Sequence, residues 1–371
     1  EALIEKRWCG GSGRSGAKAL ASEVGRAAGS RRPLALTMGD PAGIGLDITL
    51  LAWRDRAKNA LPPFVLYADP TSVAERARTL GLAVDLAVSE DIGAGRDAFA
   101  ARLPVRPVPL AVPVVAGRTE MLNAGGIIAA IDFAVADAVA GRASAVATNP
   151  IAKSTLLRAG FHHPGHTEYL AELAGRHHPG KRWVPVMMLA SEILRVVPLT
   201  VHVPIARVPG LLSVERINET VRIVADAMTS DFGIAKPRIA VTGLNPHAGE
   251  EGTIGREEVN VIEPALAALR AEGLAVTGPH SADSLFHGDA RKRYDAVVTM
   301  YHDQALIPIK TLSFESAVNV TLGLPFVRTS PDHGTAFDIA GTGTASPSSL
   351  VAALKLAADL AERRAAAQRH A

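Results

Sequence analysis

The segment LALTMGDPAGIG, residues 34–45, decides the fold class, because an apolar run, a glycine-rich turn and the start of a helical pattern follow one another in it. Leu34–Met38 has the apolar content of a buried strand, and the glycines of Gly39–Gly45 allow a sharp turn into the next segment. The turn is neither the dinucleotide fingerprint G-x-G-x-x-G nor a Walker loop. A strand that leads into a helix is the repeating unit of α/β proteins, in which ligands collect at the carboxyl ends of strands.

The same alternation continues along the chain. Further apolar runs predicted as buried strands are 64–67, 145–148, 186–189, 239–242, 296–300 and 318–321, and the helical patterns cover 123–140, 166–174, 214–229, 257–271 and 348–364. We therefore expect an α/β fold with a largely parallel sheet. Prolines at positions 104, 107, 109 and 113 predict an extended edge or connecting segment there, not an inner strand.

Composition excludes several classes of protein. The 371 residues are 48% hydrophobic, and 39 Lys and Arg against 37 Asp and Glu give a net charge of +2, which argues against disorder and against a dedicated nucleic-acid-binding protein. The single cysteine, Cys9, forms no internal disulfide, so we expect a cytoplasmic location. The best candidate for a membrane span, Ile127–Ala140, is interrupted by Asp132 and Asp137 and is too short. Residues 1–33, which are rich in Gly, Ser and Arg, predict a flexible basic extension.

Three histidines lie where apolar runs give way to turn residues: His202, His247 and His302. Imidazoles at strand ends can converge on one divalent cation and leave a coordination position open for a substrate. Imidazole suits zinc, copper, nickel or iron better than it suits magnesium. The alternative is that these are three separate turn histidines among the twelve in the chain.

Two further clusters have the chemistry of anion binding. Gly165–Glu168 opens a helix, where His166 and Thr167 can donate to an oxyanion such as phosphate. An apolar stretch from Lys310 to Arg328 also contains Asn319, and charged residues buried in such a stretch need partners, which an anionic substrate would supply. The alternatives are an ordinary helix start and a solvated edge strand.

Taken together, seven blocks resemble the 4-hydroxythreonine-4-phosphate dehydrogenase family of pyridoxal phosphate biosynthesis, in the order Gly39–Gly45, Thr148–Lys153, Gly165–Glu168, Leu244–Glu250, Met300–Gln304, Asn319–Ser330 and Asp332–Ala336. The resemblance extends from Leu34 to Ala366, with Leu46–Asp47 where the family usually has Pro-Glu. It implies NAD(P)-dependent oxidation of 4-phosphooxy-L-threonine to 2-amino-3-oxo-4-phosphooxybutanoate, which decarboxylates to 3-amino-2-oxopropyl phosphate.

The resemblance also implies an architecture. The expected protein is a homodimer of two-lobed α/β/α subunits, similar to isocitrate and isopropylmalate dehydrogenases, with shared active sites in the interlobe cleft at the dimer interface. The first lobe would comprise residues 34–147 plus 315–371, and the second, residues 148–314, would carry the metal ligands and dimer contacts.

Residue by residue, the resemblance assigns His202, His247 and His302 to one divalent ion (Zn, Co or Mg). It assigns the substrate to His166, Thr167, Lys310, Asn319 and Arg328, with Lys310 also catalytic, and NAD or NADP to Asp332, His333, Gly334 and Thr335. Alternatives are a related dehydrogenase acting on threonate or erythronate 4-phosphate or on an aromatic cis-dihydrodiol, a metal-dependent hydrolase, and a non-catalytic binder of phosphorylated metabolites.

Overall fold

The computed structural model describes residues 32–163 and 165–370. Cys9 and the basic extension predicted for residues 1–33 lie outside the described residues, except for residues 32 and 33. The described residues from Pro33 onward form one compact unit. Its division into lobes 34–147 plus 315–371 and 148–314 stays a prediction.

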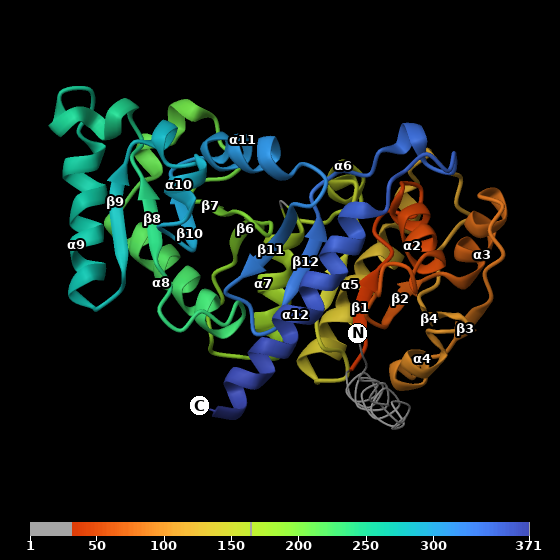
Figure 1. The fold of residues 1–371 in the computed structure, drawn as a ribbon. Coiled ribbons are helices and arrows are strands. Elements are labelled where there is room, and N and C mark those ends of the chain that lie inside the picture. The colour runs from red at the N-terminus through yellow and green to blue at the C-terminus, as the bar shows by residue number, and fades with distance from the viewer. Residues whose placement is uncertain (1–31, 164, 371) are drawn as a thin grey trace, which may run out of the picture. The chain divides into compact units, whose positions relative to one another are not determined.

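Strands and helices alternate along most of this unit (Figure 1). The strands are β1 (Leu34–Thr37), β2 (Phe64–Ala68), β3 (Leu86–Val88), β4 (Leu103–Pro107), β5 (Val146–Thr148), β6 (Val186–Ala190), β7 (Arg195–Pro198), β8 (Ile239–Thr242), β9 (Val276–His280), β10 (Ala296–Thr299), β11 (Val318–Leu322) and β12 (Arg328–Pro331). The α-helices are α2 (Gly45–Arg54), α3 (Pro70–Thr79), α4 (Ile92–Ala98), α5 (Ala124–Val139), α6 (Lys153–Arg158), α7 (His166–His177), α8 (Val214–Ser230), α9 (Glu263–Ala271), α10 (Gly288–Arg291), α11 (His302–Ser313) and α12 (Ser348–His370).

Single helical turns complete the inventory. Most are 3-10 turns: η1 (Met121–Asn123), η2 (Ile205–Arg207), η3 (Pro209–Leu211), η4 (Pro246–Gly252), η6 (Ala282–Ser284) and η7 (Phe337–Ile339). A π-helical turn, η5 (Glu258–Ile262), leads directly into α9.

One sheet joins all the strands in the order β3-β4-β2-β1-β5-β12-β11-β6-β7-β10-β8-β9. Its two ends are parallel blocks, whereas β11 pairs antiparallel with both β12 and β6, and β6 pairs antiparallel with β7. The parallel blocks therefore run in opposite directions, and they are joined by antiparallel strands. The expectation of an α/β fold with a largely parallel sheet is confirmed, since eight of the eleven strand pairings among the described residues are parallel; the antiparallel junction in the middle was not expected.

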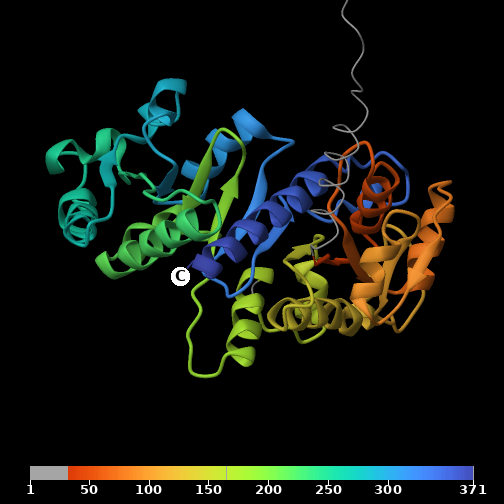
Figure 2. The same ribbon diagram turned by 60° about the horizontal axis from the view of Figure 1, so that its bottom comes forward.

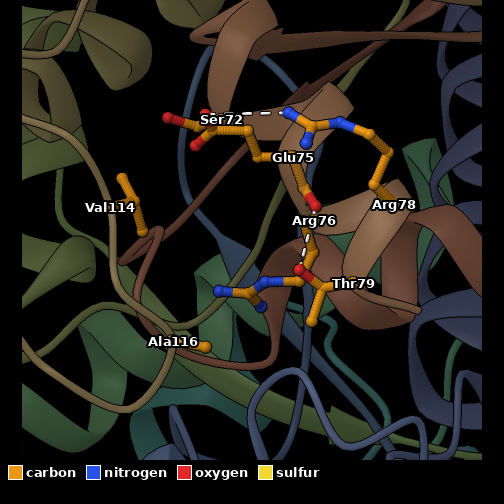
Figure 3. A pocket seen from close by; sticks show the side chains of 7 residues that line it. All are labelled: Ser72, Glu75, Arg76, Arg78, Thr79, Val114 and Ala116. Carbon is orange, nitrogen blue, oxygen red and sulfur yellow. Dashed lines mark hydrogen bonds and ion pairs between the residues drawn. The ribbon is translucent and has the colours of Figure 1, made fainter. Parts of the chain in front are cut away.

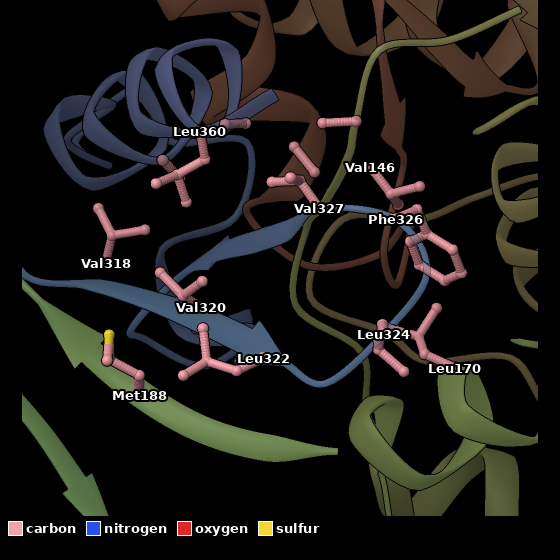
Figure 4. Close-up of a cluster of buried hydrophobic side chains, with 14 of the residues drawn as sticks. Val146, Leu170, Met188, Val318, Val320, Leu322, Leu324, Phe326, Val327 and Leu360 are labelled. Atoms are coloured by element: carbon pink, nitrogen blue, oxygen red, sulfur yellow. The ribbon is translucent and has the colours of Figure 1, made fainter. Parts of the chain in front are cut away.

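Helices cover both faces of the sheet (Figure 2). α5 packs on β1, β2, β5 and α7, while α12 packs on β12, β11, α2 and α8. In the middle of the sheet, Figure 4 shows Val320 of β11, Phe326 and Val327 among buried side chains that reach from Leu170 of α7 to Leu360 of α12. A second buried cluster, which includes Val196, Val297 and Ile309, lies under α11.

The proline-rich segment departs from the sequence-based expectation. Residues 103–107 form β4, which pairs in parallel with both β2 and β3 and is therefore an inner strand. Pro104 and Pro107 lie near the two ends of this short strand, where a missing amide costs the ladder least. Val108 restores the pattern by donating its amide to the Ala68 carbonyl at 3.0 Å.

The apolar helix is also longer than the sequence suggested. Met121–Val139, formed by η1 and α5, is long and apolar enough to cross a membrane by length and composition alone, so the expectation that this stretch is too short was wrong. The same helix has 44% of its most apolar window buried inside the protein, where Ile127, Ile131 and Val135 belong to the core. This placement is that of a core helix.

Candidate active site

A cavity of about 530 Å³ gathers side chains from seven separate segments, of which β6 with the residue before it and the segment after β7 contribute Pro185, Met187, Val201 and His202. The other five are the turn after β5, the first turn of α7, helix α11, strand β11, and β12 with the turn that follows it. All five residues assigned to the substrate line the cavity, namely His166, Thr167, Lys310, Asn319 and Arg328. Asp332, His333 and Gly334, which were assigned to the nucleotide, line the same cavity.

Arg328 is the central cation of this cavity. Its side chain is only 3% exposed, and it donates to the hydroxyl oxygens of Thr321 at 3.0 Å and Thr148 at 2.6 Å. Its Nε has no partner, and none of the described carboxylates forms an ion pair with it. Burial lowers the pKa of Arg328 to about 10. A buried guanidinium without a counter-ion is poorly solvated, so an anion entering the cavity would find a ready partner.

His166 and Asn319 add unpartnered polar atoms to the same cavity. His166 begins α7 directly after Gly165, and its buried Nε2 has no hydrogen-bond partner. Burial, reinforced by the charges of Arg328 and Lys153, holds the pKa of His166 well below its usual range, so its ring is neutral. The Oδ1 atom of Asn319 is likewise buried and unpartnered. Buried polar groups without partners are rare in folded proteins, and here they surround a cavity.

Lys153 is a cationic residue that we left out of the predicted site. It opens α6 and lines the cavity, and a Cβ added at Gly165 would lie 3.4 Å from its Nζ. The signal was its place at a helix start directly after a strand, which in isolation is more typical of a solvated lysine. Asn149, from the same turn, was missed as well; its buried Oδ1 has no partner.

Lys310 and Asp332 connect the substrate and nucleotide assignments. Nζ of Lys310 lies 2.9 Å from Oδ2 of Asp332, and the two side chains are 37% and 18% exposed. The ion pair fixes the lysine on the cavity wall next to the turn 332–334. Thr335 lies outside the cavity lining; its carbonyl accepts the amide of Ile44 at 2.9 Å and so ties this turn to the glycine-rich loop.

Two of the three predicted metal ligands meet. The rings of His202 and His302 are 5.7 Å apart between centroids, and both line the cavity. Nδ1 of His302 lies 2.7 Å from Oδ1 of Asp303, a contact that orients the ring and leaves Nε2 available. Burial, with smaller contributions from the charges of Lys153 and His302, lowers the pKa of His202 and favours the neutral ring that binds metals.

His247 does not join them within this chain. All three histidines follow the carboxyl ends of neighbouring strands, since β10 pairs in parallel with both β7 and β8. His247, however, lies in η4 and lines neither the main cavity nor the smaller cavity of about 230 Å³ beside His202 and His302. Among the described residues, no group of three or more His, Cys, Asp or Glu side chains is close enough to hold a metal ion.

The donor set nevertheless fits a metal shared between two chains. Two imidazoles leave coordination positions open, and a third imidazole from another copy would complete a three-histidine site. Two exposed apolar side chains line the smaller cavity beside the pair: Val203 is 38% exposed and Ile205 68%. Exposed apolar side chains grouped next to an incomplete site are typical of an interface.

Comparison with known proteins agrees with this geometry. Residues 60–357 match the family model described as pyridoxal phosphate biosynthetic protein PdxA. The 4-hydroxythreonine-4-phosphate dehydrogenase of Methylorubrum populi is 56% identical over 339 residues, which cover 90% of this chain and 96% of the relative.

Solved structures give the same picture. The 4-hydroxythreonine-4-phosphate dehydrogenase of Klebsiella pneumoniae is similar with a TM-score of 0.80 at 36% identity, covering 90% of this chain and 98% of that one. A terephthalate 1,2-cis-dihydrodiol dehydrogenase from Burkholderia xenovorans is similar with a TM-score of 0.60 at 28% identity, covering 89% and 98%.

Proposed function

Since this chain belongs to the family of pyridoxal phosphate biosynthetic proteins PdxA, we propose that it is a 4-hydroxythreonine-4-phosphate dehydrogenase. It oxidises 4-phosphooxy-L-threonine with NAD or NADP to 2-amino-3-oxo-4-phosphooxybutanoate. That product is a β-keto acid, and it loses carbon dioxide to give 3-amino-2-oxopropyl phosphate. The observation that carries the proposal is the buried Arg328, which has no counter-ion among the described residues and lies in a cavity lined by the other substrate residues.

The substrate brings the counter-ion that Arg328 lacks within the described part of the chain. Its phosphate and carboxylate are the anions for Arg328 and Lys153, because a guanidinium can grip an oxyanion through two parallel hydrogen bonds. Neutral His166, Thr167 and Asn319 offer hydrogen bonds that fix the orientation of the substrate. Binding therefore satisfies polar atoms that are buried and unpartnered in the chain alone.

His202 and His302 of one chain, with His247 of a second, would hold the divalent metal. Imidazole ligands favour zinc or cobalt over magnesium. When bound, the ion supplies Lewis-acid polarisation of the substrate oxygen. Asp303 orients the ring of His302, so it acts on that ligand without touching substrate.

Oxidation removes a hydride from the carbon that bears the hydroxyl and a proton from its oxygen. NAD or NADP, when bound, would accept the hydride. Asp332, His333 and Gly334 of the cavity lining, with Thr335 next in the chain, would hold the nucleotide. Lys310 belongs to the substrate residues and is paired with a nucleotide residue, Asp332. It transfers the proton, or it holds the carboxylate that is lost as carbon dioxide. Its ion pair with Asp332 places its ammonium group for either step.

The enzyme is a cytoplasmic homodimer with two shared sites. Because His202 and His302 pair within one chain, a chain carrying His202→Ala and a chain carrying His247→Ala should restore one complete site in their heterodimer. Up to about half of the wild-type activity is expected in isolated heterodimers. A His202→Ala chain with a His302→Ala chain is the matched control, because each site then lacks one ligand. No recovery by the first pair would reject sharing.

The substrate is tested by a panel. Reduction of NAD and NADP is followed by fluorescence with 4-phosphooxy-L-threonine, threonate 4-phosphate, erythronate 4-phosphate and an aromatic cis-dihydrodiol. We expect the highest kcat/KM with the first. A preference for the dihydrodiol would favour the activity named for the Burkholderia structure, and hydrolysis without nicotinamide reduction would reject the dehydrogenase.

A further inference from the structure

The loop that carries His247 has an unusual backbone. Five consecutive residues are left-handed, with φ of 54° at His247, 53° at Ala248, 77° at Gly249, 43° at Glu250 and 56° at Glu251. Residues other than glycine adopt this region only at a cost in energy, so such a run persists only where its surroundings hold it. A turn of this kind sets the direction in which the His247 side chain leaves the backbone.

A buried carboxylate holds the base of this turn. Glu258 is 1% exposed, and its Oε1 accepts the backbone amides of Leu244 at 2.7 Å and Asn245 at 2.8 Å. Its Oε2 accepts the side-chain amide of Asn245 at 2.9 Å. A Cβ added at Gly249 would lie 2.5 Å from Oε2, so the turn is packed directly against the carboxylate.

A second polar side chain connects this assembly to the other histidines. Gln304 lies two residues after His302. Its Nε2 donates to the Gly243 carbonyl at 2.9 Å, and its Oε1 accepts from the Thr242 hydroxyl at 2.8 Å. Its Oε1 also accepts the Met300 amide at 2.9 Å. The chain segments that lead to His247 and to His302 are thus fixed to one another.

We propose that Glu258 is a positioning residue for metal binding: it holds the left-handed turn 247–251 so that His247 points out of its own chain, toward the His202–His302 pair of a second chain. The inference rests on the proposed function, because it takes His247 as a ligand in the dimer. Glu258 touches neither metal nor substrate. It acts through the backbone of Leu244 and Asn245.

The test uses Co²⁺ alone as the probe, added to the metal-free, full-length dimer. Visible absorption reports the cobalt coordination, and its titration gives the affinity. We expect Glu258→Gln to bind Co²⁺ about 10- to 100-fold more weakly and with an altered absorption band, as orienting groups of metal ligands do. Glu257→Gln is the matched control: its Oε2 accepts the Asn245 side-chain amide at 2.8 Å and the Arg256 amide at 3.1 Å but no backbone amide of Leu244 or Asn245, so this variant should stay within about twofold of wild type.

Each outcome is decisive. If Glu258→Gln melts like wild type and keeps its cobalt affinity and spectrum while His247→Ala loses them, the positioning role is overturned and the proposed function stands. If His247→Ala keeps wild-type Co²⁺ binding, His247 is not a metal ligand, and that part of the proposed function is rejected. Should Glu258→Gln not fold, Glu258→Asp, which keeps the charge but is too short to reach the amides of Leu244 and Asn245 in the same way, should weaken Co²⁺ binding about tenfold. Unchanged binding in that variant overturns the proposal.

Discussion

Two buried arginines of this protein differ in what surrounds them. Arg76 of α3 is 4% exposed and forms an ion pair with the buried carboxylate of Asp47. It also donates to the carbonyls of Gly43 and Pro41, each at 2.9 Å. Arg328 is 3% exposed and meets only two threonine hydroxyls. A buried charge with a full set of partners supports the fold, whereas one without a counter-ion is poised for a ligand.

The surroundings of Arg76 show what a structural arginine does. Asp47 accepts the amide of Gly341 at 2.6 Å, so the pair joins α2, α3, the glycine-rich loop and the segment after η7. Arg76 also lines a cavity of about 440 Å³ with other residues of α3 and with Val114 and Ala116 (Figure 3). None of the residues lining that cavity has a buried side-chain nitrogen or oxygen without a partner, unlike those around Arg328.

The largest effect is expected at the paired arginine. Arg76→Leu leaves the Asp47 carboxylate buried and alone, which should lower the free energy of unfolding by about 3–5 kcal/mol. Urea denaturation measures this. The double variant Asp47→Leu with Arg76→Leu removes both charges and should recover part of the loss. If Arg76→Leu is as stable as wild type, the proposed difference between Arg76 and Arg328 is wrong.

The unpaired arginine should behave in the opposite way. Arg328→Leu removes a buried cation that has no counter-ion, so the free energy of unfolding should stay constant or rise. Its affinity for 4-phosphooxy-L-threonine should fall by about 2–5 kcal/mol, or roughly 30- to 4000-fold, since the bound anion loses its charged partner. Calorimetric titration gives the affinity. Arg328→Lys is the control, because a lysine keeps the charge but not the two-pronged contact. Unimpaired binding with lost stability would make Arg328 structural.

A smaller effect is expected in the pH dependence of the free energy of unfolding, through His166, whose pKa is lowered by burial and in part by Arg328. The pKa of His166 lies well below its ordinary 6.5, because of burial and then the nearby Arg328 and Lys153. As pH falls, the unfolded chain binds a proton there before the folded chain does, so the free energy of unfolding falls with pH. Between pH 7 and 5.5 this loss should be about 1 kcal/mol in metal-free protein.

The measurement is urea denaturation at both pH values. The variant His166→Asn lacks the titrating ring and should lose correspondingly less stability between them. Groups that titrate elsewhere contribute equally to both proteins, so the difference isolates position 166. Identical pH dependence in the two would mean that His166 is not buried in the neutral form.

The local pattern of apolar residues in the sequence predicted many of the strands and helices. The seven predicted strands are present within one or two residues, as is the helix that begins at Val214, because long apolar or amphipathic runs depend little on distant contacts. The helix predicted over 348–364 begins as expected but continues to His370. The remaining strands were not predicted. β3 and β9 are short or polar, and β12 begins with Arg328, whose charge is typical of an exposed position until the cavity is known.

By itself the sequence determined the strand–turn–helix units and the residue types at their ends, since glycine, histidine and arginine act there through their own chemistry. Only the tertiary structure decided which ends meet. It brought Arg328, His166 and Lys310 to one cavity, put His202 beside His302, and left His247 outside the cavities that those two histidines line. Strand order and direction are set by packing between segments far apart in the chain, and spacing along a sequence carries no measure of that distance in space.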